Sequence, residues 1–530
     1  MATVVREIER KYDPAAGTTA ALDAVQAMTG TAGIAAVSRQ GEQLLDAVCY
    51  DTADLGLIGA GITLRRRTGG ADAGWHLKLP AGADTRDEIR LPLAAEADKP
   101  AAGTAPGTAG RRAATPRAGV GGAVPEELAA LVRAHTRGTA LAPVVRIRTS
   151  RRVLRLLDGS GQTLAEVAAD HVSAEPADRS AVSWDEIEAE LVTGGPALLE
   201  TIDTRLRQAG ARPATAATKL QRALAGRLSA AGAAREPPPL TRGSPAGQVV
   251  LGYVRGQVAA IWRYDPQVRR DAPDAVHQMR VATRRARSAL QAFGTIIDRD
   301  ATRPLCAELK WLATALGPAR DGEVMLDRLT AELAAIPPAL VSGPMQARIT
   351  GHSAAELAQA GTAALAALDE QRYLRLPDDL DALLADPPLT PRAARKADKV
   401  LAKPVRRAAR RLQRARAAVP GAGDRDAAIH EARKTAKRAR YAAEAATPAL
   451  GRTAGRQAAR AKDLQQLLGD HHDSVVARTV LLDLAGQARA AGEDTFTYGL
   501  MHQRQACQAA TIEQALPRYT ATRRDRTMGQ

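Results

Sequence analysis

A duplicated cationic segment is the feature that most limits what this chain can fold into. The stretch HQMRVATRRARSALQAF begins at His277, and HEARKTAKRARYAAEAA begins at His430. Basic residues follow each histidine at the same four offsets, three, seven, eight and ten, and a Leu-Gly-x-x-x-Asp block recurs downstream in register. Because two separated segments share this spacing, we predict that the C-terminal half is an internal duplication.

The spacing also predicts where the charges lie. On an α-helix, which turns by about 100° per residue, offsets of zero, three, seven and ten fall on one side. The His277 and His430 segments should therefore each present a cationic stripe. Like charges crowded on one helix side repel each other, so the stripes cost stability unless an anion meets them. A merely solvated face is the alternative for either stripe alone. No cysteine or carboxylate stands at a ligand spacing beside the two histidines, which argues against metal ligation.

Composition agrees with a helical, cationic second half. Hydrophobic residues make up 45% of the chain but aromatic residues only 3%, so the cores must be built mainly from Ala, Leu and Val. The net charge is +16. Residues 1–230 hold 28 Lys and Arg against 27 Asp and Glu, and the remainder holds 46 against 31, so nearly all the excess lies beyond residue 230. Such a surface favours polyanionic partners.

Two low-complexity stretches divide the chain. Residues 99–125 are Gly, Pro, Ala and Thr with little to bury, and they predict a mobile insertion. Residues 228–246 predict a linker. We therefore expect a strand-rich domain over 1–227, a helical domain over 247–520 and a tail over 521–530. Within the helical domain, we expect prolines such as Pro266 to break helices.

The first half shows strand alternation with charges on one face. In VREIERKYD, Glu7, Glu9 and Lys11 alternate with Ile8 and Arg10, so the two carboxylates and the ammonium share a face. Five further strands repeat the pattern, with acidic residues on the first and last strands and basic residues between them. A sheet with one solvated face is the simpler reading. If the sheet closes into a barrel, its charged lumen suits a polyphosphorylated anion with a divalent cation.

These blocks resemble the CYTH superfamily, the triphosphate tunnel metalloenzymes. EIERK is similar to its E-x-E-x-K signature, and CYDTADLGLIGAGITLRRR, LAEVAADHV, WDEIEAEL and ATKLQRAL resemble its later blocks, over residues 3–227. The resemblance implies Mg²⁺ or Mn²⁺ as cofactor. It implies metal binding by Glu7, Glu9, Asp170, Glu186 and Glu188, triphosphate binding by Arg65, Arg67, Lys78, Arg86, Arg146 and Arg148, and catalytic roles for Lys11, Glu88 and Lys219.

The duplicated blocks resemble the CHAD domain, the conserved histidine α-helical domain, whose H-x-x-R-x-x-x-R/K-R-x-R and L-G-x-x-x-D motifs occur twice over residues 245–520. The resemblance implies two pseudo-symmetric four-helix bundles behind an antiparallel β-barrel, an α+β multidomain chain. It also implies binding of inorganic polyphosphate by His277, Arg280, Arg284, Arg285, Arg287, Lys310, His430, Arg433, Lys434, Lys437, Arg438 and Arg440.

Together these features predict a metal-dependent triphosphatase joined to a polyphosphate-binding module. An adenylate cyclase and a non-enzymatic polyanion scaffold are the alternatives. Stacking residues are scarce, so we expect nucleic acid to bind only non-specifically. Three scattered cysteines, a charged N-terminal segment and the lack of a long apolar run predict a cytoplasmic protein, associated with polyphosphate granules and without a membrane partner.

Overall fold

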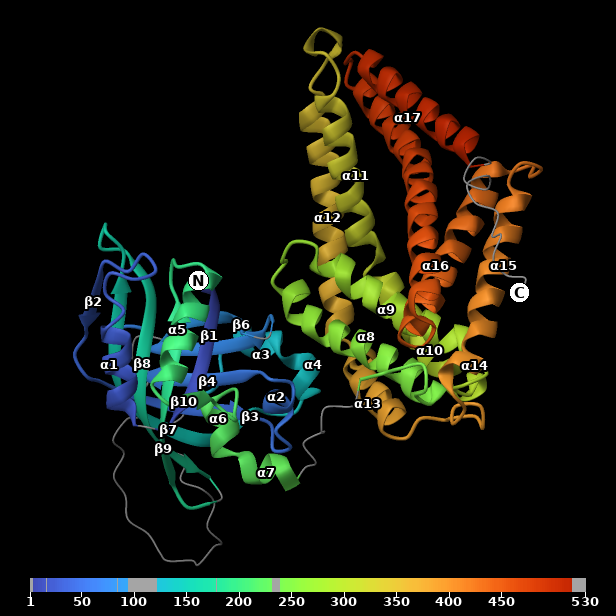
Figure 1. Ribbon diagram of the computed structural model, residues 1–530. Coiled ribbons are helices and arrows are strands. Elements are labelled where there is room, and N and C mark those ends of the chain that lie inside the picture. Colours follow the sequence, from blue (N-terminus) through green and yellow to red (C-terminus); the bar gives the residue numbers. More distant parts are fainter. Residues whose placement is uncertain are drawn as a thin grey trace, which may run out of the picture. The chain divides into compact units, whose positions relative to one another are not determined.

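The computed structural model describes residues 3–15, 17–82, 84–93, 122–177, 179–230 and 239–516. The chain forms two compact units, Met1–Pro237 and Pro238–Gln530 (Figure 1). Most of the predicted insertion, the middle of the predicted linker and the predicted tail lie outside the described residues.

The first unit is an antiparallel β-barrel. Eight strands close it in the order β1, β6, β5, β4, β3, β7, β8, β9 and back to β1, while β10 pairs with β1 and β2 with β7. The strands are β1 (Thr3–Pro14), β2 (Ala36–Arg39), β3 (Gln43–Asp51), β4 (Thr63–Thr68), β5 (Gly74–Pro80), β6 (Thr85–Pro92), β7 (Ala142–Leu157), β8 (Thr163–Pro176), β9 (Val182–Leu191) and β10 (Ala211–Pro213).

Closure depends on β1, which changes partner along its length. Its first residues pair with β6, with Glu7 opposite Arg86, and its later residues pair with β9, with Lys11 opposite Glu188. The E-x-E-x-K segment therefore lies where the first and last strands of the barrel meet. Alternate residues of one strand face opposite sides of a sheet, so Glu7, Glu9 and Lys11 point into the barrel, and Ile8 packs on its outer core.

Helices cover the outside of the barrel and close one end. Apolar residues of α1 and α5 pack with β7, β8 and β9 in one core. Leu220, Ala223 and Leu224, on and directly after α6, form another core with Cys49 and Ile147. The helices of this unit are α1 (Thr18–Gln26), α2 (Gly56–Gly59), α3 (Glu126–Leu131), α4 (Arg133–Thr136), α5 (Pro196–Gln208), α6 (Lys219–Ala223) and α7 (Ala225–Ala230).

The second unit is helical throughout its described residues. Its first repeat contains α8 (Ala246–Arg269), α9 (Ala275–Ala292), α10 (Arg299–Ala315), α11 (Gly317–Ala334), η1 (Pro338–Leu340), α12 (Met345–Asp369) and α13 (Gln371–Ala385). Its second repeat contains α14 (Ala397–Val400), α15 (Ala402–Ala418), α16 (Arg425–Ala490) and α17 (Phe496–Ala515). The predicted break at Pro266 is wrong, because α8 continues to Arg269.

The 66-residue α16 is two helices joined at a kink. Gly451 has φ 57° and ψ −141°, which interrupts the helical backbone, and a positive φ is least costly at glycine. The two halves of α16 pack with α15 and α17 around Val419, Ile429, Leu468 and Leu516. Four helices therefore enclose one core, and the predicted fold class is confirmed.

Small side chains build much of the interface near the two cationic segments. Ala282, Ala286 and Ala289 on α9 and Ala436 and Ala439 on α16 are buried, and α9 contacts α16. Alanine faces allow helix axes to approach closely, so the two cationic segments come together. None of the described helices is long and apolar enough to cross a membrane.

Candidate functional sites

The barrel lumen is a charged cavity of about 410 Å³. Its wall receives side chains from all eight barrel strands and from α6. Lys and Arg side chains alternate there with carboxylates. Most of the site residues predicted for the barrel line this cavity: Glu7, Glu9, Lys11, Arg65, Arg67, Lys78, Arg86, Glu88, Glu188 and Lys219.

Three carboxylates of β8 and β9 converge beside the lumen. Asp170 faces Glu186 directly across the two strands, and Glu188 follows two residues later on the same face. One oxygen from each lies within 4.8 Å of the others. Lys219, the first residue of α6, places its Nζ 2.8 Å from Asp170 and 2.7 Å from both Glu186 and Glu188. The three carboxylates offer the oxygen ligands that hard divalent cations prefer, and the Lys219 ammonium offsets part of their negative charge.

Two more cations hold the same cluster. The Lys11 Nζ contacts Glu188 and lies 3.4 Å from Glu9, and the Arg151 guanidinium contacts both Asp170 and Glu188. Burial opposes ionisation of Glu188, but the charges of Lys11, Lys219 and Arg151 outweigh it and hold the pKa of Glu188 well below its usual range. This carboxylate is therefore fully charged at neutral pH.

Glu7 and Glu88 lie in a second cluster. The Lys78 ammonium contacts Glu7 and lies 3.7 Å from Glu88, and Arg90 contacts both carboxylates. The His76 Nδ1 lies 2.9 Å from Glu88. Burial raises the pKa of Glu88, yet the His76 hydrogen bond and the Lys78 charge outweigh burial and lower it. Of the five predicted metal ligands, Asp170, Glu186 and Glu188 thus converge, and Glu7 and Glu9 do not join them.

Glu190 is a lumen carboxylate whose pKa lies near neutrality. It lies on β9 in the lumen wall. Burial, followed by the charges of Glu7 and Glu9, raises the pKa of Glu190 to about 7. This residue therefore changes charge near neutral pH, and the lumen carries an acid that gains and loses a proton under ordinary conditions.

Three arginines of the middle strands line the lumen as predicted. The Arg65 Nη2 lies 3.7 Å from Glu88, and the Arg86 Nε lies 3.7 Å from Glu9. Arg67 contacts Asp72. Burial, and then the charge of Arg65, lower the pKa of Arg67, which indicates that positive charge is crowded on this side of the lumen.

The prediction that Arg146 and Arg148 line the lumen is wrong. Both lie outside the cavity wall, which receives Ile147 and Arg151 from the same strand. Arg146 pairs with Asp46, and Arg148 pairs with Glu175. Alternation along β7 allows either Arg146 and Arg148 or Ile147 to face the lumen. The apolar residues Leu220, Ala223 and Leu224, on and directly after α6, pack against Ile147, which places Ile147 inside. Arg151 was missed because it lies beyond VRIRT, although it continues the alternation from Ile147.

In each repeat of the helical unit, the histidine–arginine segment contacts the Leu-Gly-x-x-x-Asp block of the same repeat. Arg280, at offset three from His277, donates to the Gly317 carbonyl at 2.9 Å and lies 3.1 Å from Asp321. Arg433, the equivalent residue, lies 3.8 Å from Asp473. The Leu-Gly-x-x-x-Asp block therefore orients the first arginine of each stripe, and both copies preserve this role.

Cations from both repeats influence one another. Burial, followed by the charges of Arg433, Arg284 and Arg280, lowers the pKa of Lys437 to about 7. Burial also lowers the pKa of Arg284, and the charges of Arg280 and Arg433 add to this effect. Offsets three and seven of the two stripes thus form one concentration of positive charge, which favours an anion between α9 and α16.

The two motif histidines, His277 and His430, border this cluster. Burial, and then Arg320, lower the pKa of His277, and burial, and then Lys434, lower that of His430. The ring centroid of His472 lies 4.8 Å from that of His430, and burial, and then Arg433, lower the pKa of His472 to about 4. His472 lies outside both repeated motifs, and only helix packing brings it beside His430.

The remaining predicted residues do not join this cluster. The Arg285 Nε lies 3.2 Å from Glu444, and the Arg440 Nε 2.6 Å from it. Lys434 is exposed and lies 3.6 Å from Glu431 on its own helix. Lys310 on α10 and Arg438 on α16 are exposed, and the Arg287 Nε is buried without a hydrogen-bond partner. The predicted stripe of offsets zero, three, seven and ten is therefore divided, because offset ten does not join the cluster. The arginines at offset eight, which lie outside that stripe, do not join it either.

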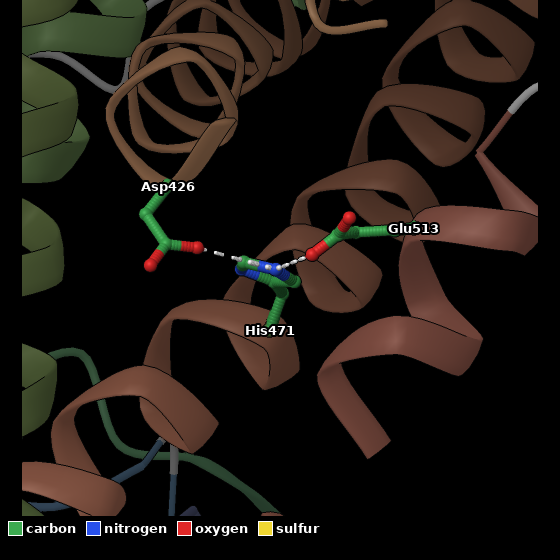
Figure 2. Close-up of side chains that lie close together, drawn as sticks. All are labelled: Asp426, His471 and Glu513. Carbon is green, nitrogen blue, oxygen red and sulfur yellow. Dashed lines mark hydrogen bonds and ion pairs between the residues drawn. The ribbon is translucent and has the colours of Figure 1, made fainter. Parts of the chain in front are cut away.

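One histidine, His471, lies between two carboxylates, Asp426 and Glu513, among helices of the second repeat (Figure 2). His471 is buried, and its Nε2 lies 3.2 Å from Glu513 of α17 and 3.7 Å from Asp426 near the start of α16. A histidine and two carboxylates are side chains that can bind a metal ion. However, Arg425 lies 3.3 Å from Glu513 and Arg478 lies 3.8 Å from Asp426, so both carboxylates already have cationic partners. The cluster joins three helix segments.

Comparisons with known proteins agree with this architecture. The CHAD domain family matches residues 252–482. Uncharacterized protein Rv2226 of Mycobacterium tuberculosis (strain ATCC 25618 / H37Rv) is 39% identical over 521 residues, which cover 94% of this chain and 93% of that protein.

Two solved structures are also similar. The CHAD domain from the plant Ricinus communis is 25% identical, with a TM-score of 0.43, over 55% of this chain and 96% of that one. HpAC1 from Hippeastrum, which has a dominant triphosphatase activity, is 14% identical, with a TM-score of 0.23, over 42% of this chain and 95% of that one.

The barrel carries the E-x-E-x-K strand at its closure, and the helical unit carries both CHAD motif pairs in contact. The chain therefore belongs to the family of this mycobacterial protein, with an antiparallel β-barrel followed by a CHAD domain.

Proposed function

We propose that the barrel hydrolyses a small triphosphate with the help of a divalent cation, and that the helical unit binds inorganic polyphosphate. The observation that carries the first part is the meeting of Asp170, Glu186 and Glu188 beside a lumen lined with Lys and Arg. Oxygen donors of this kind fit Mg²⁺ or Mn²⁺. A bound cation would supply charge stabilisation for the phosphoryl oxygens.

The chain's own residues have separable roles in this proposal. Arg65, Arg67 and Lys78 bind the phosphate oxygens and spread their charge. Lys219 offsets part of the charge of the three carboxylates in the free protein, and it would contact phosphate if a divalent cation took its place there. Glu190, whose pKa is about 7, accepts the proton of the attacking water. Release of orthophosphate from the terminal position completes the reaction.

The test is phosphate release from tripolyphosphate with Mg²⁺ or Mn²⁺. Arg65→Gln removes a lumen arginine and should lower kcat/KM by about tenfold or more. Arg148→Gln is the matched control because Arg148 lies on the outer face, and it should keep near wild-type activity. Absence of phosphate release by the folded wild type under either metal would refute the proposal. Cyclic AMP as the main product from ATP would assign the lumen to a cyclase instead.

For the helical unit, the supporting observation is the joint cluster of Arg280, Arg284, Arg433 and Lys437. A long polyphosphate chain contacts both repeats, and the second contact then forms at a high effective concentration. Arg284→Gln should therefore weaken long-chain binding more than tripolyphosphate binding, and it should reduce the salt dependence. Equal weakening of both lengths, or displacement of polyphosphate by duplex DNA at equal phosphate, would contradict this assignment.

A further inference from the structure

A second cavity in the helical unit has no role in the functions proposed above. It measures about 420 Å³ and lies among α9, α10, α15 and α16. Leu290, Pro404 and Ala408 supply apolar wall. The cationic wall consists of Arg299, Arg303, Arg407, Arg411 and Arg438.

Because the two repeats are equivalent, the helical unit has a second position that corresponds to this cavity. There, Glu444 accepts ion pairs from Arg285 of the first repeat and Arg440 of the second, and the Tyr253 hydroxyl of α8 donates to it at 3.1 Å. The Tyr441 ring lies under both guanidiniums, 5.6 Å from each. A carboxylate and an aromatic ring therefore fill this position and offset part of its positive charge.

The cavity carries the same offsets with different side chains. Arg438 is the repeat equivalent of Arg285, and Arg287 is the equivalent of Arg440. Tyr441, however, corresponds to Ser288, and Glu444 corresponds to Gln291, and both of these residues line the cavity. The first repeat thus lacks the ring that would fill the space and the carboxylate that would neutralise the arginines.

The positive charge around the cavity is largely uncompensated. Of the residues that line it, only Asp300 carries a carboxylate, and it lies 3.6 Å from Arg303. Across the described part of the chain, no carboxylate forms an ion pair with Arg407, Arg411 or Arg438. The Arg287 Nε is buried without a hydrogen-bond partner. Crowded arginines without counter-charge favour an external anion.

We propose that this cavity binds a small molecule through a mono- or diphosphate group, which takes the place that the Glu444 carboxylate holds in the other half. Arginine forks match phosphate oxygens, and the apolar wall leaves room for an organic portion such as a nucleoside. Of the predicted polyphosphate residues, only Arg438 lines the cavity, and the site does not depend on activity of the barrel.

Gln291→Glu tests the proposal because it supplies the missing carboxylate from the protein itself. We would titrate full-length protein with inorganic pyrophosphate, in EDTA, by calorimetry. The lumen contributes equally in all variants, so the change between variants reports the cavity. Gln291→Glu should weaken one class of site by about tenfold or more, and Gln291→Met should not. Identical isotherms for wild type and Gln291→Glu would overturn the proposal.

Cys306 lines the cavity and localises the binding. Pyrophosphate should slow its alkylation by iodoacetamide, while exposed Cys507 serves as an internal control. Arg411→Gln should remove this protection, and Arg410→Gln, on the same helix but outside the cavity wall, should keep it. Stronger protection by ADP than by pyrophosphate would indicate a nucleotide, and the reverse would indicate the free anion. Pyrophosphate binding that persists unchanged in both Gln291→Glu and Arg411→Gln would place it elsewhere.

Discussion

Lys437 should make polyphosphate binding depend on pH. In the free protein, burial and the neighbouring charges of Arg433, Arg284 and Arg280 lower the pKa of Lys437 to about 7. A bound polyanion favours the charged ammonium and raises that pKa. Binding above pH 7 therefore takes up a proton, and the affinity falls as the pH rises.

The size of the effect follows from the shift. With a pKa of about 7 in the free protein and a value several units higher in the complex, each pH unit above 7 costs about 1.4 kcal/mol, which is about tenfold in Kd. Between pH 6 and pH 8 the affinity for long-chain polyphosphate should thus fall by about tenfold. Salt must be held constant, because counterion release changes affinity independently.

Lys437→Arg is the matched variant, since an arginine keeps its charge throughout this range. Calorimetric titrations at pH 6, 7 and 8, in two buffers of different ionisation enthalpy, measure both Kd and proton uptake. We expect uptake approaching one proton at pH 8 in the wild type and a smaller uptake in Lys437→Arg. If both proteins showed the same pH dependence, the histidines or the ligand would cause it, and the reasoning about Lys437 would be wrong.

Three other substitutions have defined outcomes. Glu190→Gln should stabilise the barrel by about 3 kcal/mol at pH 8 and by almost nothing at pH 4. Burial raises the Glu190 pKa from 4.5 to about 7, so ionised Glu190 destabilises the folded state at high pH, and glutamine removes this cost. A pH-independent difference in urea unfolding would contradict this. Glu444→Gln should destabilise the helical unit by about 1–3 kcal/mol, and added phosphate should restore part of the melting temperature; an unchanged melting temperature would mean that Arg285 and Arg440 need no counter-charge. His471→Ala should cost about 1–3 kcal/mol of unfolding free energy, and EDTA should leave the wild-type helical unit unchanged; loss of stability in EDTA would instead indicate a metal at this histidine.

Sequence reasoning identified the elements whose signals are local. The equal offsets after His277 and His430 predicted the duplication, and alternation around Glu7 and Glu9 predicted a strand with one charged face. Both features depend on the period of a helix or a strand, which neighbouring residues determine. The contact between each Leu-Gly-x-x-x-Asp block and the arginine of its stripe also follows the duplication, since both motifs repeat together.

Contacts between distant segments required the tertiary structure. Alternation along β7 permits either Arg146 and Arg148 or Ile147 and Arg151 to face inward, and only barrel closure with the α6 plug selects the second phase. Likewise, Lys219 reaches the carboxylates of β8 and β9 only because α6 closes the barrel end.

In the helical unit, too, some features follow from the sequence and others only from the packing of the helices. The sequence by itself determined that offsets eight and ten recur as basic residues in both repeats. Only the packing of α9 against α16 decided that Arg285 and Arg440 meet one carboxylate, Glu444, while Arg438 lines an open cavity. A repeat determines equivalent positions, but the residues that face each other across its pseudo-twofold axis come from different copies, and their differences become visible only when the copies are packed together.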